Sequence, residues 1–210
     1  MTLRPTYEHP RTREYLAPGG PWDIPSLDTV LTDAARRSRG DLLIDESNGV
    51  RLDGRALEAM VARVAGGLRA NGIGRGDVVA WQAPNWHEVV VLYRAAWRLG
   101  AVAAPIHHMA GGAEIDLMLA TVEPTVWLPR DDVRGMGARF AALLDGEPVT
   151  ASAARPADLA AVIFTAGSTG GPSVGASRTS CRSGLGHCRP RHDEGDERDD
   201  EDHDRRDQPG

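Results

Sequence analysis

Glycine, serine and threonine gather in one short segment, residues 165–171, directly after the apolar run 159–164. The apolar run is typical of a buried strand. Small residues let backbone N–H groups approach an anion closely, and the hydroxyl groups of Thr165, Ser168 and Thr169 add further donors. The segment therefore predicts a phosphate-binding loop at the end of a strand, although a simple flexible turn would use the same residue types.

Helical and strand patterns alternate through the chain that precedes this loop. Ser26, Asp53 and Asn85 are placed to cap helices, and Asn71-Gly72 is placed to end one. We expect helices at 27–35, 57–68, 89–99, 113–120 and 133–144, strands at 78–82, 101–106, 125–128 and 159–164, and a hairpin of 42–44 with 50–52 about Asn48-Gly49.

Strands that alternate with helices at this spacing predict an α/β fold, with a parallel sheet flanked by helices. In such sheets, ligands bind at the carboxyl ends of the strands. The loop after Phe164 occupies that position in the predicted sheet, which favours the phosphate-binding interpretation.

The loop resembles the phosphate-binding signature of the adenylate-forming superfamily, the AMP-dependent synthetases and ligases. The residues that fall on this signature are Phe164, Thr165, Gly167, Ser168, Thr169, Gly170 and Pro172. Ala166 replaces a usual serine, and Ser173 and Val174 stand where lysine and glycine are usual. Upstream, segments 72–81, 84–86 and 99–106 are also similar to this superfamily, so the resemblance extends from about residue 27 to 172 and is greatest to acyl-CoA synthetases.

The resemblance implies a flavodoxin-like fold and a reaction in two halves. A carboxylic acid would attack ATP, with Mg²⁺, to give an acyl-adenylate and pyrophosphate, and CoA would then accept the acyl group. The residues implied in nucleotide binding are Thr165, Ala166, Gly167, Ser168, Thr169, Gly170 and Gly171, and no catalytic residue is implied within the chain. His107-His108 would border the acyl pocket, although an ordinary pair of loop histidines is the alternative.

All 24 basic residues are arginine, so the chain has no lysine to supply the ammonium group that the signature usually carries. We therefore expect an N-terminal fragment of such a ligase that is inactive alone. Two alternatives stay open: half of a split ligase completed by a separate chain, or a non-catalytic α/β module whose acidic tail binds a basic partner.

The character of the sequence changes abruptly after Pro172. Residues 1–172 form the predicted AMP-binding domain, and residues 173–210 are rich in Asp, Glu, Arg and His, which predicts a low-complexity, disordered tail. A shift of reading frame after Pro172 is our hypothesis for this change. Translation of the two other frames tests it, because the absence of a ligase-like continuation from both would refute it.

Composition excludes several other classes of protein. The net charge of −6 argues against a nucleic-acid-binding surface, and no apolar run reaches the roughly 20 residues of a membrane helix. Residues 1–15 lack the apolar core of a signal peptide, and both cysteines lie in the tail, so we expect a cytoplasmic protein.

Two other sites suggested by the tail are also disfavoured. Cys181, His187, Cys188 and His192 fit no common zinc spacing, so we expect no metal site. Segment 170–177 has the spacing of a P-loop, but Ala176 stands where the phosphate-binding lysine is required.

Overall fold

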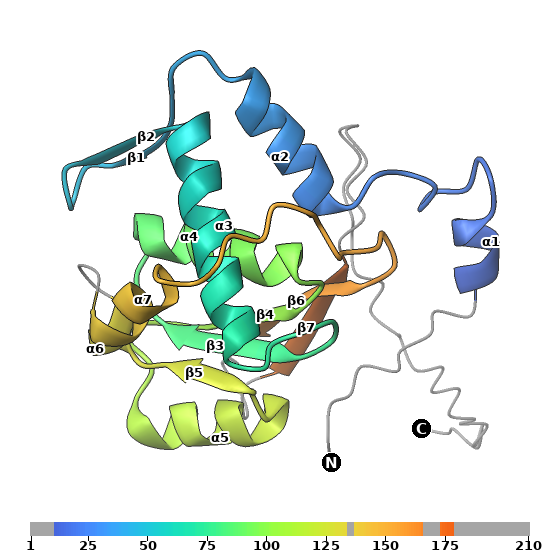
Figure 1. The fold of residues 1–210 in the computed structure, drawn as a ribbon. Coiled ribbons are helices and arrows are strands. Elements are labelled where there is room, and N and C mark those ends of the chain that lie inside the picture. Colours follow the sequence, from blue (N-terminus) through green and yellow to red (C-terminus); the bar gives the residue numbers. More distant parts are fainter. Residues whose placement is uncertain (1–10, 134–136, 166–172, 179–210) are drawn as a thin grey trace, which may run out of the picture.

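The computed structural model describes residues 11–133, 137–165 and 173–178 (Figure 1). The helices are α1 (Thr12–Leu16), α2 (Leu27–Arg37), α3 (Gly54–Ala70), α4 (His87–Arg98), α5 (Gly112–Val122), α6 (Arg130–Val133) and α7 (Ala138–Leu143). The strands are β1 (Asp41–Asp45), β2 (Val50–Asp53), β3 (Val78–Gln82), β4 (Val102–Ile106), β5 (Val126–Leu128), β6 (Leu159–Thr165) and β7 (Ser173–Arg178). None of the helices in these ranges is long and apolar enough to cross a membrane.

The central sheet has the strand order β5-β3-β4-β6-β7. Strands β5, β3, β4 and β6 run parallel, and β7 pairs antiparallel with β6 at the edge. The predicted parallel sheet is therefore confirmed. Helices α3 and α4 cover one face of the sheet and α5 covers the other, as Figure 1 shows.

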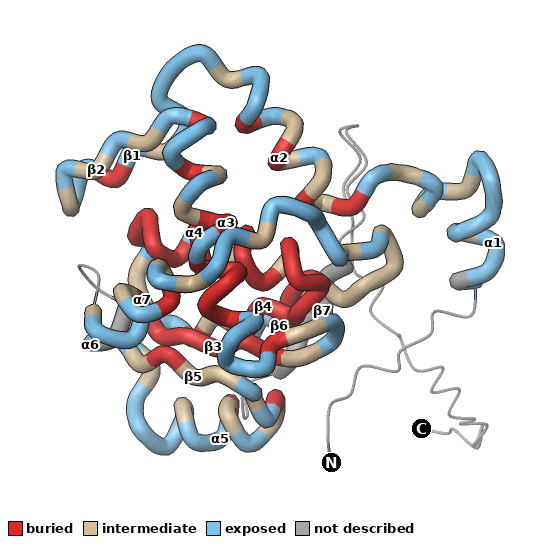
Figure 2. Tube along the Cα trace, viewed as in Figure 1, coloured by how far each residue is buried: buried red, intermediate tan, exposed pale blue. Residues whose placement is uncertain are grey.

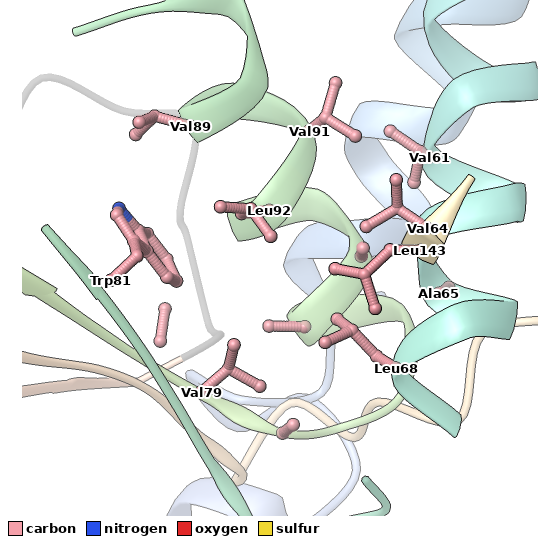
Figure 3. Packing of buried hydrophobic residues seen from close by; sticks show 14 of the residues in the cluster. Val61, Val64, Ala65, Leu68, Val79, Trp81, Val89, Val91, Leu92 and Leu143 are labelled. Atoms are coloured by element: carbon pink, nitrogen blue, oxygen red, sulfur yellow. The ribbon is translucent and has the colours of Figure 1, made fainter. Parts of the chain in front are cut away.

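The main core lies between the sheet and the layer of α3 and α4. Figure 2 shows that buried residues concentrate in this part of the molecule. Trp81 from β3 is fully buried and points toward Leu92 of α4, which packs in turn near Leu68 of α3 (Figure 3). A smaller cluster, which includes Val122 of α5, occupies the opposite face of the sheet.

Several local predictions are confirmed by hydrogen bonds at the ends of elements. The side chains of Ser26 and Asp53 accept from the N–H groups of Thr29 and Ala56 and cap α2 and α3. Gly72 follows α3 with a φ of 85°, a left-handed conformation that glycine adopts at little cost. The β1–β2 hairpin also forms as expected, and most other element ends fall within two residues of their predicted positions.

The predicted helix at 133–144 is wrong, because the structure has α6 and α7 there instead. Gly137 is the residue immediately before α7, and its ψ of 154° is not helical. Glycine at 137 explains why α7 begins only after it, since glycine loses more backbone entropy in a helix than other residues do.

The predicted cap at Asn85 is also wrong. Helix α4 begins at His87, and its N-cap residue, Trp86, provides no side-chain hydrogen bond. Asp45, at the end of β1, accepts the backbone N–H of His87 at 2.9 Å instead. A carboxylate from the hairpin therefore supplies the cap that the local sequence does not.

Residues 173–178 differ from the sequence prediction, which assigns them to the tail. The structure places them in β7, paired with β6 from Thr165↔Ser173 to Leu159↔Arg178. Backbone hydrogen bonds to the free edge of β6 need no apolar side chains, so composition is a poor guide to such a strand. The rest of the predicted tail lies outside the described residues.

Candidate functional site

The carboxyl ends of β3 and β4 form the point at which the chain leaves the sheet toward opposite faces. The chain after β3 enters α4, whose Leu92 belongs to the main core, whereas the chain after β4 enters α5, whose Val122 belongs to the smaller cluster. In parallel α/β sheets, this divergence leaves a crevice between the two strand ends, where ligands bind.

Gln82, the last residue of β3, ties these two strand ends together. Its side chain is buried, with 9% exposed, and its Nε2 atom donates to carbonyl oxygens of the loop after β4. The acceptors are His107 and His108, both at 3.4 Å, and Ala110 at 3.2 Å. Gln82 therefore holds the loop at 107–110 against the end of β3.

The histidine pair predicted from the sequence lies in this loop. The two rings face each other at a tilt of 39°, with centroids 4.5 Å apart. The Nδ1 atom of His107 accepts the backbone N–H of Met109 at 3.2 Å, so the neutral ring carries its proton on Nε2. His107 as a whole is exposed at this edge of the sheet.

The predicted phosphate-binding segment begins at the same edge. Strand β6 runs parallel to β4 with Ala161 opposite Ala103, so His107 and Thr165, four residues further along each chain, reach the same level. Thr165 ends β6 and is the Cα partner of Ser173, so the two ends of the segment face each other across the strand pair. The other predicted nucleotide-binding residues lie outside the described residues: Ala166, Gly167, Ser168, Thr169, Gly170 and Gly171.

Comparison with known families identifies the chain at this point. The sequence profile of the AMP-binding enzyme family matches residues 31–173, which run from α2 to the first residue of β7. The chain belongs to the AMP-binding enzyme family. The expected resemblance to adenylate-forming enzymes is thus confirmed.

Curated relatives of this AMP-binding chain include fatty-acid–CoA ligases. The chain is 30% identical over 170 residues to the medium/long-chain-fatty-acid–CoA ligase FadD6 of Mycobacterium tuberculosis, covering 71% of this chain and 28% of the relative. It is 29% identical over 106 residues to the medium-chain fatty-acid–CoA ligase of Escherichia coli, and this match covers 50% of this chain and 19% of the relative.

Solved structures agree with the family assignment. The apo structure of Mycobacterium smegmatis MbtA matches with a TM-score of 0.68 and 25% identity, over 81% of this chain and 36% of that one. The chain spans 32%, 19% and 28% of the lengths of the first three curated relatives that it matches.

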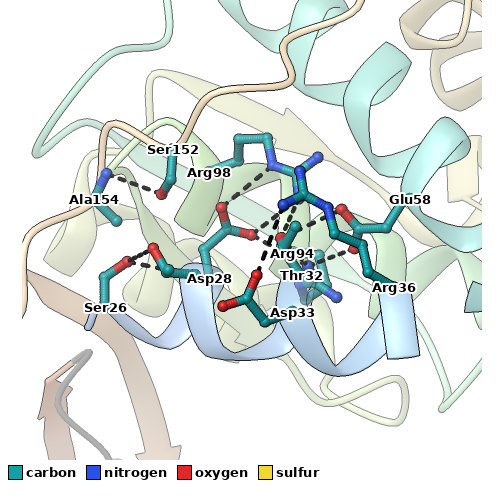
Figure 4. A network of polar contacts seen from close by, with 11 residues as sticks. Ser26, Asp28, Thr32, Asp33, Arg36, Glu58, Arg94, Arg98, Ser152 and Ala154 are labelled. Atoms are coloured by element: carbon teal, nitrogen blue, oxygen red, sulfur yellow. Dashed lines mark hydrogen bonds and ion pairs between the residues drawn. The ribbon is translucent and has the colours of Figure 1, made fainter. Parts of the chain in front are cut away.

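A buried network of charges, which the sequence analysis missed, joins three helices of the AMP-binding fold (Figure 4). Arg94 and Arg98 of α4 pair with Asp28 of α2 and with Glu58 of α3. The shortest contacts are 2.6 Å, from each arginine to Glu58. Thr32 of α2 accepts from both arginines. The spacing of Arg94 and Arg98, one helical turn apart among apolar residues of α4, is the signal that could have revealed the network.

The network perturbs the ionisation of its members. Burial by itself would raise the pKa of Glu58, but the hydrogen bond from Arg98 and the charge of Arg94 hold this pKa below its usual value. Burial would lower the pKa of Arg98, but the charge of Asp28 and its hydrogen bond raise it. The network therefore favours the charged forms of Glu58 and Arg98.

A second buried cluster, also missed, lies where the hairpin meets α4. Asp45, His87 and Glu88 are buried and offer possible metal ligands within 4.8 Å of one another. The Oδ2 atom of Asp45, however, already faces the backbone N–H of His87, its Nδ1 atom and the Nδ2 atom of Asn48, at 2.9, 3.0 and 2.7 Å. We therefore interpret this cluster as a hydrogen-bonded junction that anchors the hairpin to α4.

The junction favours the charged form of Asp45. Burial would raise the pKa of this carboxyl group, but hydrogen bonds from Asn48 and His87 hold the pKa well below its usual range. The sequence signal for this junction is weak, because Asp45 and His87 lie 42 residues apart.

Proposed function

We propose that this chain forms the phosphate-binding, N-terminal part of an ATP-dependent acyl-CoA ligase. A carboxylate oxygen of the acid would attack the α-phosphorus of ATP, and the bond to pyrophosphate would break. The sulfur of CoA would then displace AMP from the acyl-adenylate. We also propose a cytoplasmic location for the enzyme, where both ATP and CoA are present.

One observation carries this proposal: β6 ends at the carboxyl edge of the sheet with Thr165, the first residue of the segment that resembles the family's phosphate-binding sequence. Thr165 ends β6 at the level of His107, beside the divergence between β3 and β4. The names of the relatives support a fatty-acid or related carboxylate as the acid, since two of them are fatty-acid–CoA ligases.

In this proposal the loop acts by electrostatic positioning. The backbone N–H groups of 166–171 would surround the β- and γ-phosphates of ATP, and the hydroxyl groups of Thr165, Ser168 and Thr169 would donate to phosphate oxygens. Mg²⁺ would neutralise part of the phosphate charge. Gln82 would maintain the loop at 107–110, and the exposed His107 would lie on the side from which the carboxylate approaches.

We further propose that the 210-residue chain binds ATP weakly and does not turn it over alone. Orientation of reacting groups supplies much of the acceleration in such reactions. The chain contains no lysine and spans less than a third of the length of FadD6. A few N–H and hydroxyl contacts alone would give a dissociation constant on the order of 1 mM.

Calorimetric titration of the 210-residue chain with ATP and Mg²⁺ tests the binding step. We expect weak, saturable binding that is at least about tenfold weaker in the double variant S168A/T169A, because two hydroxyl donors to a charged phosphate are lost. The control is T121A, which removes a hydroxyl that donates to the carbonyl oxygen of Leu117 within α5 and should leave ATP binding unchanged.

Pyrophosphate release in the presence of a medium-chain fatty acid tests the second step. No release above background is expected from the chain alone. Binding that is unchanged in S168A/T169A would contradict the assigned role of the loop, and steady pyrophosphate release would contradict the proposal that the chain is inactive alone.

A further inference from the structure

A cleft of about 720 Å³ lies on the helical layer, remote in sequence from the phosphate-binding segment. One wall is the C-terminal end of α2 with Ser38 and Arg39, and the other is the N-terminal half of α3. Pro148 and Thr150, from the segment after α7, close one side. A volume of this size suits a small-molecule ligand rather than a macromolecule.

The cleft carries an excess of positive charge. Its lining includes five arginines and two carboxylates, namely Arg36, Arg39, Arg55, Arg63, Arg98, Asp53 and Glu58. Glu58 is already neutralised by the buried arginines of α4, and Asp53 caps α3. Since Glu58 is paired within the buried network, Asp53 is the one other carboxylate in this lining, and the arginines outnumber it.

Two of these arginines are available to a ligand. Arg39 and Arg55 are exposed, and neither side chain forms a hydrogen bond or ion pair with any residue in the described ranges. They approach the cleft from its two walls, one after α2 and one in the first turn of α3. Arg63 makes only a 3.4 Å contact with the carbonyl of Leu144, and Arg36 lies 3.7 Å from Asp33.

The lining of the cleft also contains a fixed buried side chain and apolar surface. Arg98 of α4 lines the cleft and pairs with Asp28 and Glu58, as Figure 4 shows, so α2 and α3, which form the two walls, are both tied to α4. Ala35, Ala59 and Ala62 contribute apolar surface between the charged groups. Guanidinium groups bind phosphate oxygens through paired hydrogen bonds, which favours a ligand with several phosphate oxygens.

We propose that this cleft is a second anion site, distinct from the phosphate-binding loop, that binds a diphosphate group. The group could belong to inorganic pyrophosphate or to a nucleoside diphosphate, since both present the same charged oxygens to Arg39 and Arg55. Binding should weaken as ionic strength rises, because the arginines are exposed to solvent.

Calorimetric titration with pyrophosphate tests this site, on full chains that carry S168A/T169A to disable the loop. We expect binding that persists in this background and falls at least about tenfold on adding R39Q/R55Q. The control is R13Q/R69Q, which removes the same charge from α1 and from the far end of α3. Parallel titration with ADP shows whether a nucleoside adds affinity.

Three results would overturn the proposal: no pyrophosphate binding in the S168A/T169A background, equal binding by R39Q/R55Q, or equal loss in R13Q/R69Q. Amide chemical shifts locate the site independently. Changes at Arg39 and Arg55 would support the cleft, and changes confined to residues outside its lining would contradict it. Tighter binding of ADP would identify a nucleotide as the ligand, whereas equal binding would identify the diphosphate group alone.

Discussion

The layer of α2, α3 and α4 and the carboxyl edge of the sheet are held together in different ways. The helical layer combines a buried apolar core with ion pairs between Asp28, Glu58, Arg94 and Arg98. The edge depends on backbone loops and on Gln82, whose contacts are 3.2–3.4 Å long. The difference implies that stability resides mainly in the helical layer, whereas we propose that ligands bind at the edge, so mutations should separate stability from binding.

The largest effect on stability is expected from Asp28→Ala. Asp28 is 1% exposed, and its loss would leave the positive charge of two buried arginines incompletely balanced. Removing one partner of a buried ion pair costs about 3–5 kcal/mol. Urea unfolding should show this loss, whereas Asp33→Ala, which affects only the exposed contact with Arg36, should cost less than about 1 kcal/mol. Equal effects of the two substitutions would refute the assigned importance of the network.

Gly66→Ala should destabilise the contact between α3 and the segment after α7. A Cβ atom at Gly66 would collide with the backbone carbonyl of Glu147, so the segment would have to move. Overpacking of this kind costs about 1–3 kcal/mol. Thermal melting should detect it, and Gly40→Ala is the control because a Cβ atom there meets nothing within 4 Å.

Asp45→Asn should lower the free energy of unfolding by about 1–2 kcal/mol at pH 7, because α4 loses part of its charged cap.

The pKa values of Asp45 and Glu58 are lowered by folding. The stabilisation that these two carboxylates provide is therefore present above their unfolded pKa values, near 4, and is lost as pH falls through the folded values. Unfolding free energy should therefore fall below about pH 4 in the parent chain.

The same pH series separates Asp45 from other acids. The unfolding free energy of Asp45→Asn should fall less steeply with decreasing pH than that of the parent chain, because this variant lacks one of the two carboxyl groups whose pKa is lowered by folding. Asp41→Asn, which removes only the exposed pair with Arg51, is the control for the loss of one acidic group elsewhere in the hairpin. A parallel curve for Asp45→Asn would show that the junction does not depend on the carboxylate charge.

Gln82→Leu should have the smallest effect on stability and a selective effect at the edge. The lost hydrogen bonds are long, so the net cost should be about 0.5–1.5 kcal/mol. The ring signals of His107 and His108 should shift in NMR spectra, while those of the buried His87 should not. ATP binding should also weaken in Gln82→Leu. Asp28→Ala, measured under conditions in which it is folded, should bind ATP as the parent chain does. This pair of results would support the separation of stability from binding.

Local patterns were sufficient to predict the elements that position the site. The caps at Ser26 and Asp53 and the β1–β2 hairpin depend on residues close together in the sequence, and each strand of the parallel sheet is marked by its own apolar run. The place of Thr165 at the carboxyl edge followed from the alternation of strands and helices. These features could be predicted because residues near one another in the sequence determine them.

Features that depend on distant residues could not be predicted in this way. Asp45 caps α4 across 42 residues, and the charge network joins residues of three different helices. Strand β7 forms by pairing with the backbone of β6, which leaves little signal in its composition. In each case the stabilising partner is chosen by the tertiary fold and not by the local sequence.

The central claim is that the carboxyl edge of the sheet is the nucleotide site. Amide chemical shifts of the isotopically labelled chain, titrated with ATP and Mg²⁺, test it most directly. The account predicts changes at Gln82, at 107–110 and at 165–173 that saturate and are lost in S168A/T169A. Saturating changes that leave all three regions unaffected would contradict the account.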